Sequence, residues 1–156
     1  MIALDTNLLV YAHRTDSPFH ERARSVLESL AAAPQPWAIP WPCVHEFIVV
    51  VTHPRIYKNV TPTATVFAQL RALQALTNLA FIAEADEHLV HLEALALAAK
   101  AQGGAIHDAR IASICLSHGV AELWSADRDF SRFPTLAVRN PLIGPTPRRS
   151  PRPARA

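Results

Sequence analysis

The sequence predicts a single α/β domain, a three-layer sandwich in which a central parallel sheet is flanked by helices. A length of 156 residues fits one domain that buries its own core. Half of the residues are hydrophobic and 18% are charged, which is typical of a folded chain. Short apolar runs alternate with longer helical patterns, and this alternation favours right-handed crossovers between parallel strands.

Five short apolar runs have the length expected of buried strands and are too short for helical periodicity. The first four are clear, and the fifth is weaker. They lie at residues 2–4, 37–41, 79–83, 122–126 and 136–139.

Between these runs, apolar residues recur at helical spacing, bounded by start and stop signals. Ser17-Pro18 and Thr61-Pro62 each combine an N-cap residue with proline at the first helical position. Prolines or glycines follow the last apolar residue of most segments and end the helices there. The predicted helices span about 18–33, 43–53, 62–76, 86–102 and 107–118, and no element is predicted for residues 6–16.

The net charge of +2 comes from the end of the chain. Arg148, Arg149, Arg152 and Arg155 lie within the last nine residues; without them, 15 basic residues fall to 11, against 13 acidic residues. Residues 1–147 therefore carry −2, which weakens an argument from overall basicity to nucleic-acid binding. Residues 141–156 are rich in proline and arginine and lack periodicity, so we expect a disordered tail after a folded domain at 1–140.

Cysteine usage and hydropathy indicate a cytoplasmic protein. Cys43 and Cys115 form neither a disulfide framework nor a metal-binding motif, which favours a reducing compartment. Residues 1–5 lack the basic start and long apolar stretch of a secretory signal. Every apolar run is too short to cross a bilayer, so we expect no association with a membrane.

Four acids stand out by their positions. Asp5 and Asp127 each follow a predicted strand, and ligands of open parallel sheets bind beyond the carboxyl ends of strands where the strand order reverses. Glu46 and Asp108 interrupt helices that are otherwise apolar. Taken singly, each acid also fits a structural role: Asp5 as a helix cap, Asp127 in a turn, and the other two in ion pairs.

Carboxylates gathered in one cleft repel one another, so a bound cation would stabilise them. Oxygen ligands without a partnering cysteine favour a hard ion, Mg²⁺ with Mn²⁺ as a substitute, over zinc. Such an ion activates water and stabilises charge on a phosphate, and phosphodiester hydrolysis is the reaction that this chemistry indicates.

Four motifs, in this order, resemble the PIN-domain nucleases and, within them, the VapC toxins of bacterial type II toxin–antitoxin pairs. They are Leu4-Asp5-Thr6-Asn7, His45-Glu46-Phe47 and the segments 107–112 and 123–130. The resemblance spans about residues 2–140 and implies a PIN-like sandwich and an Mg²⁺-dependent endoribonuclease.

The resemblance also implies roles for individual residues. The catalytic set would be the acidic quartet of Asp5, Glu46, Asp108 and Asp127, and the metal would be held by Asp5, Asp108 and Asp127. Glu46 or Asp127 would orient the attacking water, or take its proton if burial raised the pKa. Asn7 and Ser125 would support the cluster by hydrogen bonds, and Asp129 is either a fifth contributor or an ion-pair partner of Arg128 or Arg132.

The partners that the resemblance implies are an RNA substrate, a cognate antitoxin and a second copy of the chain. The apolar stripe of Val66, Leu70, Leu73 and Leu76 is ordinarily core. If part of it is exposed, it would suit a homodimer interface or a groove for a partner helix.

Three other functions stay open at this point. The chain could be a non-toxin PIN nuclease of RNA processing, or an RNA- or metal-binding module that does not cleave. A haloacid-dehalogenase-like phosphatase also places an aspartate after its first strand. Such an enzyme needs a second acid two residues later, where this chain has Asn7.

Overall fold

The computed structural model describes residues 1–144 and contains the predicted central parallel sheet. Its five strands lie in the order β3-β2-β1-β4-β5, and every neighbouring pair is parallel. The strands are β1 (Ile2–Leu4), β2 (Trp37–Pro40), β3 (Leu79–Ile82), β4 (Glu122–Trp124) and β5 (Val138–Arg139).

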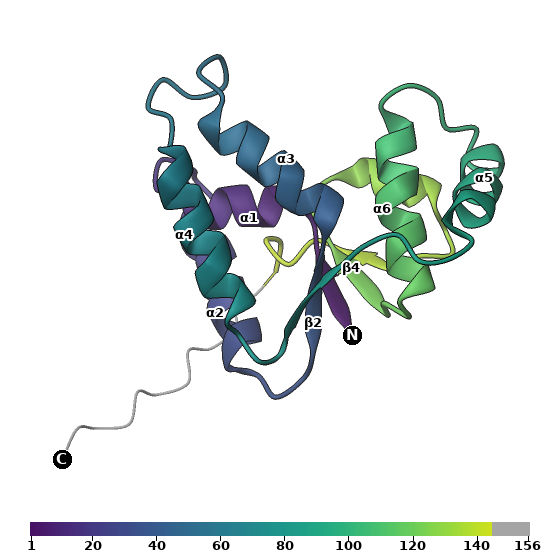
Figure 1. Ribbon diagram of the computed structural model, residues 1–156, viewed down its shortest axis with the longest axis horizontal. Coiled ribbons are helices and arrows are strands. Elements are labelled where there is room, and N and C mark those ends of the chain that lie inside the picture. Colours follow the sequence, from purple (N-terminus) through teal and green to yellow (C-terminus); the bar gives the residue numbers. More distant parts are fainter. Residues whose placement is uncertain (145–156) are drawn as a thin grey trace.

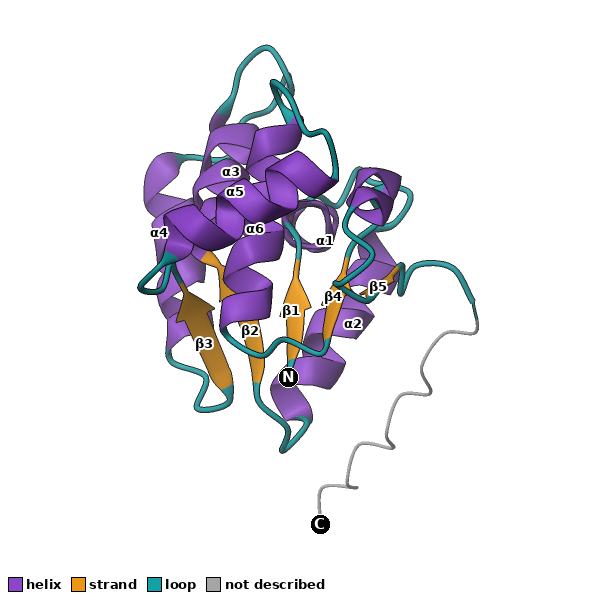
Figure 2. Ribbon diagram, turned by 90° about the vertical axis from the view of Figure 1, so that its right-hand side faces the viewer, coloured by secondary structure: helices purple, strands orange, loops and turns teal. Residues whose placement is uncertain are grey.

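Helices cover both faces of the sheet, so the predicted three-layer α/β sandwich is confirmed. Figure 1 shows α2 and α4 on one side of the strands and α5 and α6 on the other. Figure 2 shows the five strands side by side, with α2 behind them. The helices are α1 (Thr6–His13), α2 (His20–Ala32), α3 (Trp41–Thr52), α4 (Thr63–Gln74), α5 (His88–Ala98), α6 (Ala105–Ser117) and the short 3-10 helix η1 (Arg128–Arg132).

The strand order places a crevice between β1 and β4. The chain builds β1, β2 and β3 toward one edge of the sheet, and then returns to add β4 and β5 on the other side of β1. Ala3 is paired with Ala38 on one side and with Leu123 on the other. The order therefore reverses at β1, and the carboxyl ends of β1 and β4 lie next to each other.

Helix α1 was not predicted. It begins directly after β1, without an intervening loop, and the last residue before it serves as its cap: Asp5 Oδ1 accepts a hydrogen bond of 2.7 Å from the Thr6 N–H. Because Asp5 both follows the strand and caps the helix, residues 6–16 showed no separate start signal. The capping role that we considered for Asp5 is thus present.

Two predicted helices are shorter in the structure. The Ser17 hydroxyl accepts from the Phe19 N–H at 3.2 Å and stabilises a turn, so α2 begins only at His20. Helix α5 begins after Glu87, whose φ of 63° lies in the left-handed region and interrupts the helix predicted from residue 86.

The core confirms the interpretation of the α4 stripe as structural. Val66 and Leu70 are buried, and Leu73 and Leu76 pack against the core with partial exposure. This stripe therefore does not provide the exposed surface that a partner would need. Within residues 1–144, no helix is both long and apolar enough to cross a membrane.

The packed part of the chain continues past the expected boundary at residue 140. Leu142 is 3% exposed and belongs to the core, and the Arg22 guanidinium donates hydrogen bonds to the carbonyls of Leu142 and Gly144. The rest of the expected tail, including its four arginines, lies outside the described residues.

Candidate acidic active site

Asp5, Glu46, Asp108 and Asp127, the four acids singled out in the sequence, line one cleft of about 270 Å³. Asp5 follows β1 and Asp127 follows β4, at the point where the strand order reverses. Helices α3 and α6 supply Glu46 and Asp108. Elements far apart in the sequence thus bring carboxylates to the default ligand site of an open parallel sheet.

Asp5 is the most enclosed of the four acids, with 4% of its surface exposed. Its Oδ2 accepts hydrogen bonds from Asn7 Nδ2 and from the Ser125 hydroxyl, both at 2.6 Å. Its Oδ1 accepts from the Thr6 N–H and lies 3.6 Å from the Cys43 thiol. These donors hold the carboxylate in one orientation, because each oxygen is engaged from a different direction.

Asn7 and Ser125 join the ends of β1 and β4. Asn7 Nδ2 donates to the Ser125 hydroxyl at 3.1 Å, while Asn7 Oδ1 accepts from the Ala126 N–H at 3.0 Å. The Ser125 hydroxyl also accepts from the Asp127 N–H at 2.9 Å. The two residues expected to support the cluster therefore contact both Asp5 and the backbone that carries Asp127.

Thr6 is a site residue that the sequence reasoning missed. Its hydroxyl donates to Glu46 Oε2 at 2.6 Å and connects α1 to α3. Glu46 is otherwise exposed, so this bond selects one orientation among those open to an exposed glutamate. Thr6 lies within the motif Leu4-Asp5-Thr6-Asn7, but only the tertiary structure shows which acid it contacts.

Asp129 does not line the acidic cleft. Its backbone N–H donates to Asp127 Oδ1 at 2.9 Å, and Asp127 is the N-cap of η1. Its carboxylate lies 3.9 Å from the Arg132 guanidinium, one of the two pairings considered from the sequence. Asp129 therefore contacts the cluster through its backbone.

Burial and mutual repulsion raise the pKa of two of the four acids. Burial raises the pKa of Asp5, with a further contribution from the negative charge of Glu46, although hydrogen bonds from Ser125 and Thr6 oppose the shift. Burial, followed by repulsion from Asp127 and Asp5, raises the pKa of Asp108 to about 6. From the sequence, proton transfer at Glu46 or Asp127 depended on the burial of that residue. Both are exposed, and the two less exposed acids are Asp5 and Asp108.

The donor set fits a hard cation that keeps part of its water shell. All four side chains offer carboxylate oxygens, and their repulsion would be relieved by a positive ion. Within the described residues, no group of three or more His, Cys, Asp or Glu side chains forms a ready-made ligand cage. Mg²⁺ needs no such cage, because it is commonly held by one or two carboxylates and several waters.

Comparison with known proteins gives a match over most of the chain. The family model described as "PIN domain" matches residues 2–136. A curated relative, "VapC ribonuclease Mb2897" of Mycobacterium bovis, is 36% identical over 146 residues, which cover 94% of this chain and 99% of the relative.

Solved structures show the same fold. One is a crystal structure of VapBC2 from Rickettsia felis bound to a DNA fragment from its promoter, with a TM-score of 0.65 and 23% identity, covering 90% of this chain and 98% of that one. Another is a toxin-antitoxin complex from Klebsiella pneumoniae, with a TM-score of 0.58 and 22% identity, covering 90% and 98%. At these identities the two structures support the fold alone.

Proposed function

Since the chain belongs to the PIN domain family, we propose that it is a metal-dependent endoribonuclease and the toxin component of a type II toxin–antitoxin pair. The observation that carries this proposal is the convergence of Asp5, Glu46, Asp108 and Asp127 on one cleft at the switch point of the sheet. The curated relative is named a ribonuclease and matches nearly its whole length, which supports RNA as the substrate.

The proposed cofactor is Mg²⁺, with Mn²⁺ as a substitute. Asp5, Asp108 and Asp127 would hold it, directly or through water, because all three line the cleft and reach it from the end of β1, from α6 and from the end of β4. When bound, the ion supplies charge stabilisation at the scissile phosphate and lowers the pKa of water.

The residues of the chain then have separate tasks. Asn7 and Ser125 keep Asp5 in its orientation. Glu46, held by Thr6 at the open side of the cleft, would orient the attacking water and accept its proton at a carboxylate oxygen. A phosphatase of the haloacid-dehalogenase type would need a second acid at the position of Asn7. Asn7 instead donates a hydrogen bond to Asp5, so the site gives no support to the phosphatase alternative.

Incubation of the purified protein with total RNA tests the proposal. We expect fragments in the presence of Mg²⁺ or Mn²⁺ and none after chelation, with activity restored when the ion is added back. Cleavage that persists in the chelator would contradict the metal-dependent reaction. Intact RNA under both ions would instead favour a module that binds without cleaving.

Thr6→Val tests the positioning of Glu46. Valine has nearly the same shape but lacks the hydroxyl that donates to Glu46 Oε2, so we expect kcat to fall about tenfold to a hundredfold, the usual effect of losing such a supporting contact, with little change in KM. Thr6→Ser keeps the hydroxyl and serves as the matched control. Equal loss in both variants would show that the methyl packing of Thr6 matters, and not its hydrogen bond.

We further propose a cognate antitoxin, a homodimer and a cytoplasmic location. The toxin-antitoxin complex with this fold supports the antitoxin.

Helix α5 has no buried residue and exposes Leu89, Val90 and Leu97, which suits a second copy better than the packed stripe of α4. Both cysteines are free, as in a reducing compartment. Light scattering that gave the mass of one chain would contradict the dimer.

A further inference from the structure

A second, larger cavity adjoins the acidic cleft. Its volume is about 740 Å³, within the range of roughly 300–1,000 Å³ usual for small-molecule sites. It lies along the segments that follow β4 and β5, and Tyr11, Asp127 and Phe130 line both it and the acidic cleft. A strand of RNA with its scissile phosphate at the acids would therefore place a neighbouring nucleotide at this second cavity.

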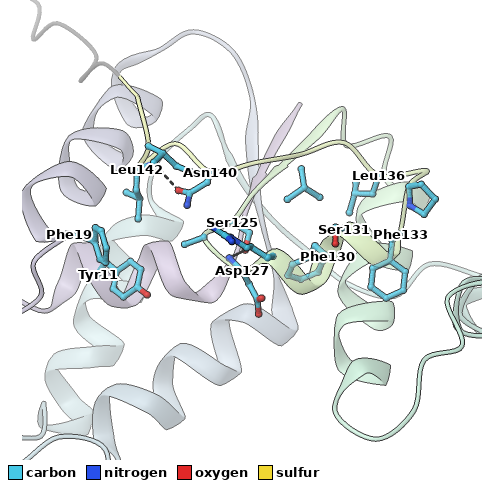
Figure 3. Close-up of a pocket in the computed structure, with 15 residues that line it drawn as sticks. Tyr11, Phe19, Ser125, Asp127, Phe130, Ser131, Phe133, Leu136, Asn140 and Leu142 are labelled. Carbon is cyan, nitrogen blue, oxygen red and sulfur yellow. Dashed lines mark hydrogen bonds between the residues drawn. The ribbon is translucent and has the colours of Figure 1, made fainter.

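One wall of the cavity offers aromatic rings to a planar ligand. Tyr11 and Phe19 lie with their ring centroids 5.2 Å apart and their planes tilted by 43°, and Phe19 is 43% exposed. Figure 3 shows both rings at one end of the cavity, and Asp127 nearer its middle. Exposed aromatic faces of this kind stack on nucleobases of single-stranded nucleic acids.

The opposite wall carries an oriented amide. Asn140 Oδ1 accepts from the Leu142 N–H at 2.9 Å, which sets the direction of the side chain. Its Nδ2 group makes no hydrogen bond to another residue of the described chain, and in Figure 3 it points into the space facing Tyr11 and Asp127. The side chain therefore presents N–H donors to a ligand, with its oxygen already engaged.

The rim is polar and carries a cation. Arg128 is exposed, lines the cavity and forms no ion pair within residues 1–144. A guanidinium at this rim can meet a phosphate of the same strand. A pocket with an aromatic wall, an amide donor and an arginine at its rim has the chemistry of a nucleotide site rather than of a purely apolar one.

We propose that this cavity receives the base of a nucleotide adjacent to the scissile phosphate, and that Asn140 selects a base that carries a carbonyl group. Uracil, guanine and cytosine present a carbonyl oxygen, whereas the acceptors of adenine are ring nitrogens, and two of these, N1 and N7, lie beside its N6 amino donor. Asparagine usually recognises adenine with its oxygen and its nitrogen together, and here the bond from the Leu142 N–H directs the oxygen away from that pairing and leaves the N–H donors for the ligand. This inference rests on the proposed function, because it assigns a specificity site to the same enzyme.

Titration with nucleosides, followed by NMR of the Asn140 side-chain amide, tests the cavity without requiring cleavage. We expect uridine to shift this signal and to bind more tightly than adenosine. Phe19→Ala should weaken both nucleosides about tenfold through the lost stacking. Asn140→Asp keeps the acceptor for the Leu142 N–H but removes the donors, so it should weaken uridine more than adenosine.

Asn59→Asp is the matched control, because it makes the same substitution at an exposed asparagine outside the cavity, and its nucleoside affinities should equal those of the wild type. Equal binding of uridine and adenosine, or an Asn140 signal that moves with neither, would overturn the proposal. 4-Methylphenol serves as a probe that resembles the side chain of tyrosine. An Asn140 signal that shifts with 4-methylphenol and with neither nucleoside would also overturn the proposal, because it would assign the cavity to a side chain of a protein partner.

Sequencing of the cut RNA ends distinguishes a failure of the cavity proposal from a failure of the proposed nuclease activity. We expect wild-type cuts to show a carbonyl-bearing base at one flanking position, and Asn140→Asp to lose this bias. A wild type that cuts RNA with the same flanking bases as Asn140→Asp overturns the cavity assignment and leaves the nuclease intact. A wild type that binds uridine but cuts no RNA overturns the nuclease and leaves the cavity.

Discussion

Asp5→Asn is expected to reduce RNA cleavage about a thousandfold while the fold is retained. The substitution removes the charge of the buried carboxylate, and the loss of metal-based charge stabilisation of several kcal/mol corresponds to about three orders of magnitude in rate. The shape of the side chain and an acceptor for the Thr6 N–H are preserved. Single-turnover cleavage at saturating RNA and matched metal concentration measures the effect.

Circular dichroism and thermal unfolding verify that the Asp5→Asn variant is folded. The matched control is Asp86→Asn, the same change at an exposed acid outside the cleft, which should cleave like the wild type. Full cleavage by Asp5→Asn would refute the assignment of the metal site to this cleft.

Asp108→Asn is expected to change activity and stability in opposite directions. Cleavage should fall a hundredfold or more, because one of the three carboxylates that would hold the ion is neutralised. The metal-free variant should nevertheless unfold at a higher temperature than the wild type at pH 8, by about 3 °C once solvent screening of a half-buried group is allowed for. The variant is more stable because asparagine carries no charge, whereas the wild-type carboxylate is half-buried beside other negative charges.

The pH dependence of this difference follows from the direction of the pKa shift. The pKa of Asp108 is raised from its usual 3.8 to about 6 in the folded protein, so the folded state binds the proton more tightly than the unfolded state. The contribution of Asp108 to wild-type stability is therefore most favourable below the unfolded pKa and is lost as the pH rises through about 6. The advantage of Asp108→Asn should vanish near pH 4 and be complete above about pH 7.

Mg²⁺ provides the complementary measurement. Added ion should raise the unfolding temperature of the wild type more than that of Asp108→Asn, because a ligand stabilises the state that binds it. The two proteins could instead have the same unfolding temperature at every pH, with and without Mg²⁺. This result would show that Asp108 neither faces the other carboxylates nor holds the ion.

The strand pattern was readable because buried strands between helical segments leave a local signal. The runs at 2–4 and 122–126 predicted the two central strands that end at the acids, and both strands are present. Helix α1 was not predicted, because its cap, Asp5, is also the residue that follows β1. The start of α2 was misplaced because Ser17 stabilises a turn before the helix instead of capping it.

The residues of the site divide in the same way. Asp5 and Asp127 were predictable from their positions at strand ends, because a parallel sheet gathers those ends at one edge. The contact between Thr6 and Glu46 was not predictable, since it depends on how α1 packs against α3. Nor was the second cavity, whose walls come from α1, the α1–α2 turn and the segments after β4 and β5.

The sequence by itself determined the α/β class, the succession of the five strands and of the helices other than α1 and η1, and the choice of four acids, because periodicity, capping and residue type are local properties of the chain. Only the tertiary structure decided that Glu46 and Asp108 meet Asp5 and Asp127 in one cleft. It also decided that burial falls on Asp5 and Asp108. The physical reason is that burial and mutual repulsion depend on distances between elements, which are set when the helices pack on the sheet.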